Sequence, residues 1–113
     1  MRHIDKMNDV VRGEFNRFVS DISKMDGVLR IYLFGSYAEG KATDSSDIDL
    51  MVVVRDGINT LDFLRGVSLG IMNRRISLDV VADTVSDFTE LSKPDRVTLQ
   101  REIISKGVLV YGK

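Results

Sequence analysis

The 113-residue chain has 16 lysines and arginines against 17 aspartates and glutamates, 43% hydrophobic residues and no cysteine. This length supports one hydrophobic core and predicts a single domain over residues 1–113, and the balanced charge excludes a basic surface for long nucleic acid. The absence of cysteine excludes disulfides and thiolate metal sites and, with no apolar stretch long enough for a bilayer, predicts a cytoplasmic protein without membrane contact.

The first predicted element is an amphipathic helix from Ile4 to Met25. Apolar residues recur there at steps of three and four, which keeps one face of a helix apolar. Gly27 stands where a glycine commonly ends a helix. The apolar face predicts packing against a sheet, and His3, the only histidine, is expected to be solvated.

Two apolar runs, Val28 to Phe34 and Ile48 to Val54, predict buried strands on either side of a polar loop. Gly35 ends the first run, where a backbone that closely approaches a ligand needs glycine. Asp47 and Asp49 stand two residues apart at the start of the second run, so their carboxylates are expected to share one face. Two charges about 5 Å apart repel by about 3 kcal/mol at an effective dielectric of about 20, which a cation or solvent must relieve.

A helix is predicted next, with Asn59 as its N-cap and its end near Asn73. Arg74 and Arg75 are expected at its C-terminal end, where cations favour the helix dipole, and phosphate binding is the alternative role. The strand that follows, Ile76 to Ala82, has one carboxylate among apolar residues, that of Asp79. This makes Asp79 a functional candidate, and a solvated acid on an edge strand is the alternative.

The last part of the chain has a weaker pattern. Residues 85–91 are consistent with a short helix or an irregular turn. A helix is predicted from Ser92, as a cap, to Ser105, with Pro94 in its first turn. The residues from Val108 to Tyr111 are expected either to add a last short strand or simply to cover the core.

The order of residues in the central loop is more informative than any one of them. Gly35-Ser36, Gly40 and Ser46-Asp47-Ile48-Asp49 follow one another between two strands. Residues 35–42, GSYAEGKA, also approach a Walker A sequence. That alternative fails because Ala42 replaces the Ser or Thr that reaches Mg²⁺, and because a turn and a strand follow in place of a helix.

The ordered motif resembles that of the minimal nucleotidyltransferases, a family of the DNA polymerase β-like nucleotidyltransferase superfamily. The shared pattern is Gly-Ser, then Gly, then Ser-Asp-x-Asp with apolar residues after it, and a looser match runs through Asp79 to the ending REIISKGVLVY. The resemblance implies an α+β fold with a mixed β-sheet flanked by helices. One departure is Glu39, which stands where the family often has a basic residue and predicts weaker triphosphate binding.

The resemblance implies a Mg²⁺-dependent transfer of a nucleoside monophosphate, AMP from ATP by analogy, to a hydroxyl acceptor. Asp47, Asp49 and Asp79 are the implied catalytic residues and the implied ligands of two Mg²⁺ ions. The implied nucleotide-binding residues are Gly35, Ser36 and Ser46.

The resemblance also implies a helical HEPN partner in toxin–antitoxin fashion, with a tyrosine of that partner as the acceptor. A small-molecule acceptor of the aminoglycoside type is one alternative, and a non-catalytic module that binds nucleotide and restrains a partner is another. The presence of all three carboxylates favours the enzyme, because a site without catalytic activity does not need them. Glu39 is the residue that favours the non-catalytic module. The sequence leaves the nucleotide, the acceptor and self-association undecided.

Overall fold

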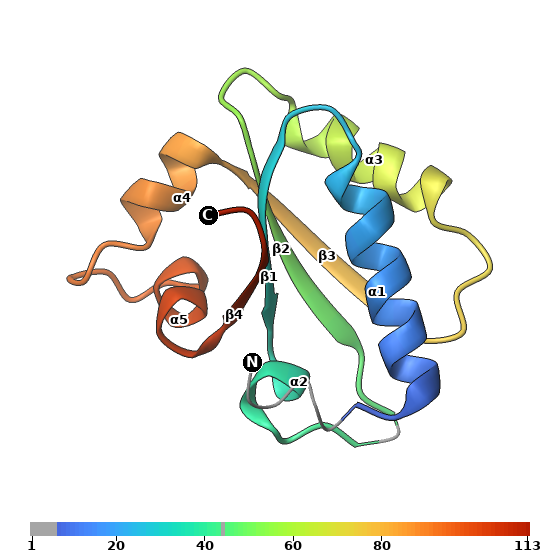
Figure 1. Ribbon diagram of the computed structural model, residues 1–113. Helices are drawn as coiled ribbons and strands as arrows, with labels where there is room; N and C mark the ends of the chain where they lie inside the picture. Colours follow the sequence, from blue (N-terminus) through green and yellow to red (C-terminus); the bar gives the residue numbers. More distant parts are fainter. Residues whose placement is uncertain (1–6, 44) are drawn as a thin grey trace.

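A four-stranded sheet in the order β3-β2-β1-β4 forms the centre of the molecule (Figure 1). Strand β1 (Val28–Phe34) pairs antiparallel with β2 (Ile48–Val54) on one side and with β4 (Val108–Tyr111) on the other. Strand β3 (Leu78–Thr84) runs parallel to β2. The sheet is therefore mixed, and the expected α+β fold is confirmed.

Helices cover both faces of this sheet (Figure 1). Helices α1 (Asp9–Ser23) and α3 (Thr60–Gly70) cover one face. Helices α4 (Val85–Leu91) and α5 (Leu99–Lys106) cover the other, and α2 (Ser36–Glu39) is a single short turn at the end of β1. In the described residues, no helix has both the length and the apolar character to cross a membrane.

Strand β2 is the most buried strand because both of its faces are covered. Its even-numbered residues, such as Leu50 and Val52, belong to the larger core beneath α1 and α3. Met51 and Val53 belong to a smaller core beneath α4 and α5, where the rings of Tyr32 and Phe88 stack at 5.3 Å. A side chain at an odd-numbered position of β2 therefore projects toward α4 and α5.

The computed structural model describes residues 7–43 and 45–113, so the predictions for His3 and for the first turn of the long helix lie outside the described residues. The described helix begins at Asp9, because the side chain of Asn8 accepts a hydrogen bond from the Val11 N–H at 2.9 Å. Asn is a preferred N-cap residue, so it can begin a helix at a point that the apolar pattern alone does not mark. The helix ends at Ser23, two residues before the predicted end at Met25.

The predicted helix from Ser92 to Ser105 is wrong at its start. Ser92 is the C-cap of α4, and α5 begins only at Leu99. Thr98 caps α5 by accepting the Arg101 N–H at 3.0 Å, and its hydroxyl donates to the Leu91 carbonyl. Ser and Thr are both common capping residues, so capping preference alone does not distinguish Ser92 from Thr98.

The boundaries between α3 and β3 also differ from the prediction. Helix α3 ends at Gly70 rather than near Asn73, and β3 begins two residues after the predicted Ile76. Arg74 and Arg75 therefore follow the helix instead of forming its last turn. The Arg75 N–H donates to Glu14 Oε2 at 2.9 Å, which ties this connection to α1.

Candidate active site

The parallel register between β2 and β3 sets Asp49 directly beside Asp79. Both residues occupy the row that continues as Met51 on β2 and Val81 on β3, which faces α4 and α5. Side chains paired in this way project from the same face of a sheet. Asp47 lies immediately before β2, so carboxylates from two separate segments of the sequence meet at one end of the sheet.

These carboxylates interact electrostatically. Partial burial of Asp49, the carboxylate of Asp79 and that of Asp47 together raise the pKa of Asp49, in that order of importance. Asp47 and Asp79 are both exposed. Like charges disfavour the ionised form of a neighbour, so the site has excess negative charge that a cation relieves.

The backbone of Gly35 lies against the carboxylate of Asp49. Gly35 has φ +74° and ψ −153°, a conformation that is essentially limited to glycine. A Cβ at this position would stand 2.2 Å from Asp49 Oδ2. Only glycine lets the Gly-Ser turn approach the acid this closely.

The turn after Gly35 is the short helix α2, which begins at Ser36 and closes at Gly40 in the left-handed conformation, φ +73°. Tyr37 is only 8% exposed, so it packs in the core. Glu39, the departure from the family pattern, forms an ion pair with Lys41 at 3.7 Å.

The loop before β2 is held by its own polar groups. The Thr43 N–H donates to Ser46 Oγ at 2.8 Å, and the Ser46 N–H donates to the Thr43 carbonyl at 3.0 Å. The Ile48 N–H donates to the Ser77 carbonyl at 2.9 Å, which fixes the start of β2 beside the approach to β3. These bonds set the position of Asp47, and they give the Ser46 hydroxyl a structural role in the loop.

The donor set suits Mg²⁺, although it is not a complete cage. Within residues 7–43 and 45–113, no three His, Cys, Asp or Glu side chains are arranged so that they could hold a metal ion together. Mg²⁺ prefers hard oxygen ligands and is usually bound by one or two carboxylates together with water and substrate phosphates. Asp49 and its neighbours are carboxylates of this kind, and the backbone of Gly35 lies directly against Asp49.

A cleft of about 210 Å³ borders this site and was not foreseen in the sequence. It includes Gly35 and Glu39 from the predicted loop, and its other lining residues are Phe34, Leu99, Glu102, Ile103, Lys106 and Gly107. Glu102 and Lys106 are four residues apart, just before Gly107. This spacing indicates that a helix there presents both side chains on one side, and it is the feature of the sequence that points to the cleft.

Comparison with known proteins agrees with this geometry. The family model described as "Polymerase beta, Nucleotidyltransferase" matches residues 18–113. Over 52 residues the chain is 38% identical to a Methanocaldococcus jannaschii protein that bears the name "Putative protein adenylyltransferase". That match covers 46% of this chain and 56% of the relative, so it spans little more than half of the relative's length.

Solved structures share the fold at low sequence identity. A Sulfolobus solfataricus protein named "putative nucleotidyltransferase" is 20% identical, with a TM-score of 0.60 over 96% of this chain and 91% of that one. A toxin–antitoxin structure with AMP-PNP gives 18% identity and a TM-score of 0.54, covering 89% and 73% of the two chains. A mutant of the MntA–HpeT toxin–antitoxin is 18% identical, with a TM-score of 0.52 over 96% of this chain and 75% of that one. With its family match over most of its length, the chain belongs to the polymerase beta nucleotidyltransferase family.

Proposed function

We propose that the protein is a Mg²⁺-dependent nucleotidyltransferase that transfers AMP from ATP to a hydroxyl acceptor. The observation that carries the proposal is the pairing of Asp49 with Asp79, with the glycine backbone of the Gly-Ser turn against Asp49. A family whose members are nucleotidyltransferases supports the reaction class. The proposed reaction needs ATP, which agrees with the cytoplasmic location expected from the sequence.

Each site residue has a role in this proposal. Asp47, Asp49 and Asp79 would share two Mg²⁺ ions, each ion held by one or two of the carboxylates and completed by water and phosphate oxygens, because no three of these side chains are placed around one ion in the described residues. Backbone N–H groups of Gly35 and Ser36 and the Ser36 hydroxyl bind phosphate oxygens, and Ser46 supports the nucleotide through the loop that it holds. When bound, Mg²⁺ supplies charge neutralisation on the phosphate oxygens.

The reaction is an in-line displacement at the α-phosphorus. The acceptor oxygen forms a bond to the α-phosphorus while the bond from that phosphorus to the oxygen bridging the α- and β-phosphates breaks, and pyrophosphate leaves. The hydroxyl proton passes to a carboxylate, for which we assign Asp79, because it is more exposed than Asp49.

We assign the acceptor to a tyrosine of a HEPN-type partner protein. The M. jannaschii relative is named as a protein adenylyltransferase, and two structures of the same fold are named as toxin–antitoxin complexes. A small aminoglycoside-type acceptor ranks second, and the chain's balanced charge argues against long nucleic acid.

The test is label transfer from [α-³²P]ATP to a co-expressed HEPN-type partner in the presence of Mg²⁺. Asp49→Asn is expected to abolish the transfer. Asp83→Asn is the matched control, because Asp83 lies on β3, on the same face of the sheet as Asp49 and Asp79, but accepts a hydrogen bond from Gln100 at 2.8 Å. Transfer that persists in Asp49→Asn, or that EDTA does not reduce, contradicts the proposed function.

A non-catalytic module is the second candidate, and Glu39 is the observation that favours it. Its carboxylate stands beside the Gly-Ser turn and forms an ion pair with Lys41. The charge of Lys41 is therefore shared with Glu39 and is less able to attract a triphosphate. This candidate predicts that Asp49→Asn restrains the partner as well as wild type does, with no label transfer in either protein.

A further inference from the structure

We infer that the cleft between α2 and α5 holds the base of the nucleotide, and that Glu102 favours a base with an exocyclic amino group. This inference rests on the proposed function and assigns a part of the site that the acidic motif leaves open. The cleft is lined by Gly35, whose backbone lies against Asp49, so a group seated in it borders the reacting phosphates.

The size of the cleft suits one ring system. Its volume is about 210 Å³, below the range of about 300 to 1,000 Å³ that is typical of clefts for drug-sized ligands. A whole nucleoside triphosphate exceeds this space, whereas its phosphates can remain outside, along the Gly-Ser turn. The cleft is thus large enough for the base alone.

The walls of the cleft offer apolar surface for the faces of a ring. Phe34, Leu99 and Ile103 line it, and Phe34 pairs with Asp49 in the β1–β2 register. Bases stack on aromatic side chains and gain about 1–3 kcal/mol per base in nucleic-acid complexes. A base that stacks on the ring of Phe34 therefore lies close to the acidic end of the sheet.

The polar rim gives the cleft its selectivity. Glu102 and Lys106 stand one helical turn apart with 3.6 Å between Oε1 and Nζ, which is longer than a hydrogen bond and leaves the carboxylate able to accept one. Adenine has an amino donor beside a ring-nitrogen acceptor, which complements a carboxylate beside an ammonium group. Glu39 also lines the cleft, but its carboxylate pairs with Lys41, so Glu102 presents the accepting carboxylate, and a base with carbonyl groups in place of the amino group, such as uracil, fits less well.

The test is calorimetric binding of non-hydrolysable ATP and UTP analogues with Mg²⁺ to wild type and Glu102→Gln. The amide keeps the size of the side chain but adds a donor, which a carbonyl group of uracil can use. We expect wild type to prefer the ATP analogue and Glu102→Gln to reduce this preference about tenfold, the size of one hydrogen bond to a charged group.

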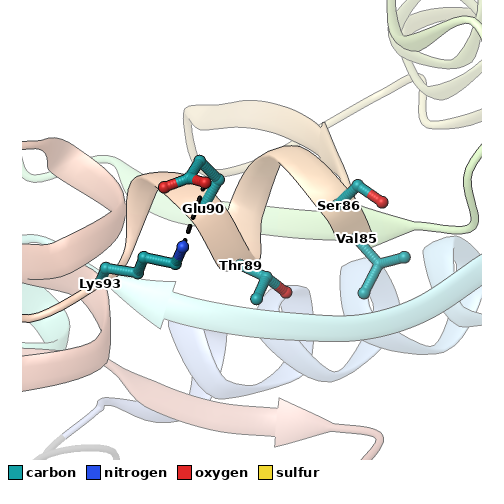
Figure 2. Close-up of a pocket in the computed structure, with 5 residues that line it drawn as sticks. All are labelled: Val85, Ser86, Thr89, Glu90 and Lys93. Atoms are coloured by element: carbon teal, nitrogen blue, oxygen red, sulfur yellow. Dashed lines mark hydrogen bonds and ion pairs between the residues drawn. The ribbon is translucent and has the colours of Figure 1, made fainter.

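Glu90→Gln is the matched control. Glu90 of α4 pairs with Lys93, which follows that helix, at 3.1 Å and lines a separate cleft of about 280 Å³ that includes none of the proposed site residues (Figure 2). The same substitution there is expected to leave the preference unchanged. A second pair of variants tests occupancy: Leu99→Trp fills the base cleft and is expected to weaken both analogues, whereas Val97→Trp, at a fully exposed position, is not.

The outcomes separate this inference from the proposed function. If wild type binds both analogues equally, or if Glu102→Gln keeps the wild-type preference, or if Leu99→Trp binds as well as Val97→Trp, the base cleft is overturned and the acidic site stands. If wild type binds neither analogue, the proposed function falls as well.

Discussion

Gly35 is the residue on which the geometry of the site depends most directly. Gly35→Ala is expected to lower the free energy of unfolding by about 1–3 kcal/mol, because the φ of +74° disfavours a Cβ and that Cβ collides with Asp49 Oδ2. It is also expected to abolish label transfer. Urea denaturation and the transfer assay measure the two effects.

Gly13→Ala is the control for this substitution. Gly13 is exposed within α1 with no heavy atom within 4 Å of a Cβ, so alanine is expected to stabilise the protein by about 1 kcal/mol. Equal stability of Gly35→Ala and wild type would show that the turn does not need glycine.

Asp49→Asn is expected to stabilise the folded protein while it removes activity. A raised pKa means that folding favours the protonated carboxyl, so the contribution of Asp49 to stability decreases as pH rises from the usual aspartate range through the raised value. At neutral pH the amide removes the cost of partly burying the charge and relieves repulsion from Asp79, for an expected gain of about 0.2–1 kcal/mol.

Thermal unfolding of the two proteins across pH measures this gain. It is expected to appear at neutral pH and to disappear below the usual aspartate pKa, where both side chains are uncharged. A difference in stability that is independent of pH would contradict the electrostatic explanation.

The residues of the motif could be predicted from the sequence because each stands at a distinctive point of an apolar run. Asp49 and Asp79 each stand in an apolar run, and Gly35 ends one. Glu102 was not predicted, because only the packing of α5 against the end of β1 brings it to the cleft. The bond from Thr43 to Ser46 likewise depends on the conformation of the loop.

At the level of the elements, Glu14 joins two segments that are far apart in the sequence. It is 8% exposed and accepts hydrogen bonds from Arg17 Nη2 at 3.0 Å and from the Arg75 N–H at 2.9 Å. It therefore connects α1 to the segment that leads into β3, the strand of Asp79.

Glu14→Ala is expected to cost about 1–3 kcal/mol, because it leaves the Arg75 N–H without its partner. The hydrogen bond from Arg17, then that from Arg75, lower the pKa of Glu14, so its stabilising effect exists at neutral pH and is lost as pH falls through the lowered value. Urea denaturation at neutral and acidic pH measures this loss.

Glu90→Ala is the comparison, because the hydrogen bonds from Arg96 and Lys93 also lower the pKa of Glu90, but these side chains are exposed. It is expected to change stability little. A cost at Glu90 as large as that at Glu14 would show that burial is not the reason.

The helices and strands could largely be predicted, whereas some of their ends could not. Apolar periodicity located α1, α3 and all four strands. Thr98 rather than Ser92 begins α5, because the Thr98 hydroxyl also bonds the Leu91 carbonyl across a turn. Capping preferences alone do not distinguish the two residues.

For the whole molecule, the pairing of strands distant in sequence creates the site. The sequence predicted a mixed sheet but not the order β3-β2-β1-β4, because no local pattern specifies which strands pair. The parallel pairing of β2 with β3 brings Asp49 and Asp79 together, and the antiparallel pairing of β1 with β4 brings α5 to the Gly-Ser turn. One sheet thus positions the proposed metal ligands and the cleft.

Calorimetric titration with Mg²⁺ and a non-hydrolysable ATP analogue tests the central claim, that Asp47, Asp49 and Asp79 act as one site. Wild type and Asp83→Asn are expected to bind the complex. Asp49→Asn and Asp79→Asn are each expected to weaken it at least about tenfold, the scale of a lost charged contact. Binding by Asp79→Asn as tight as that by Asp83→Asn would contradict the account.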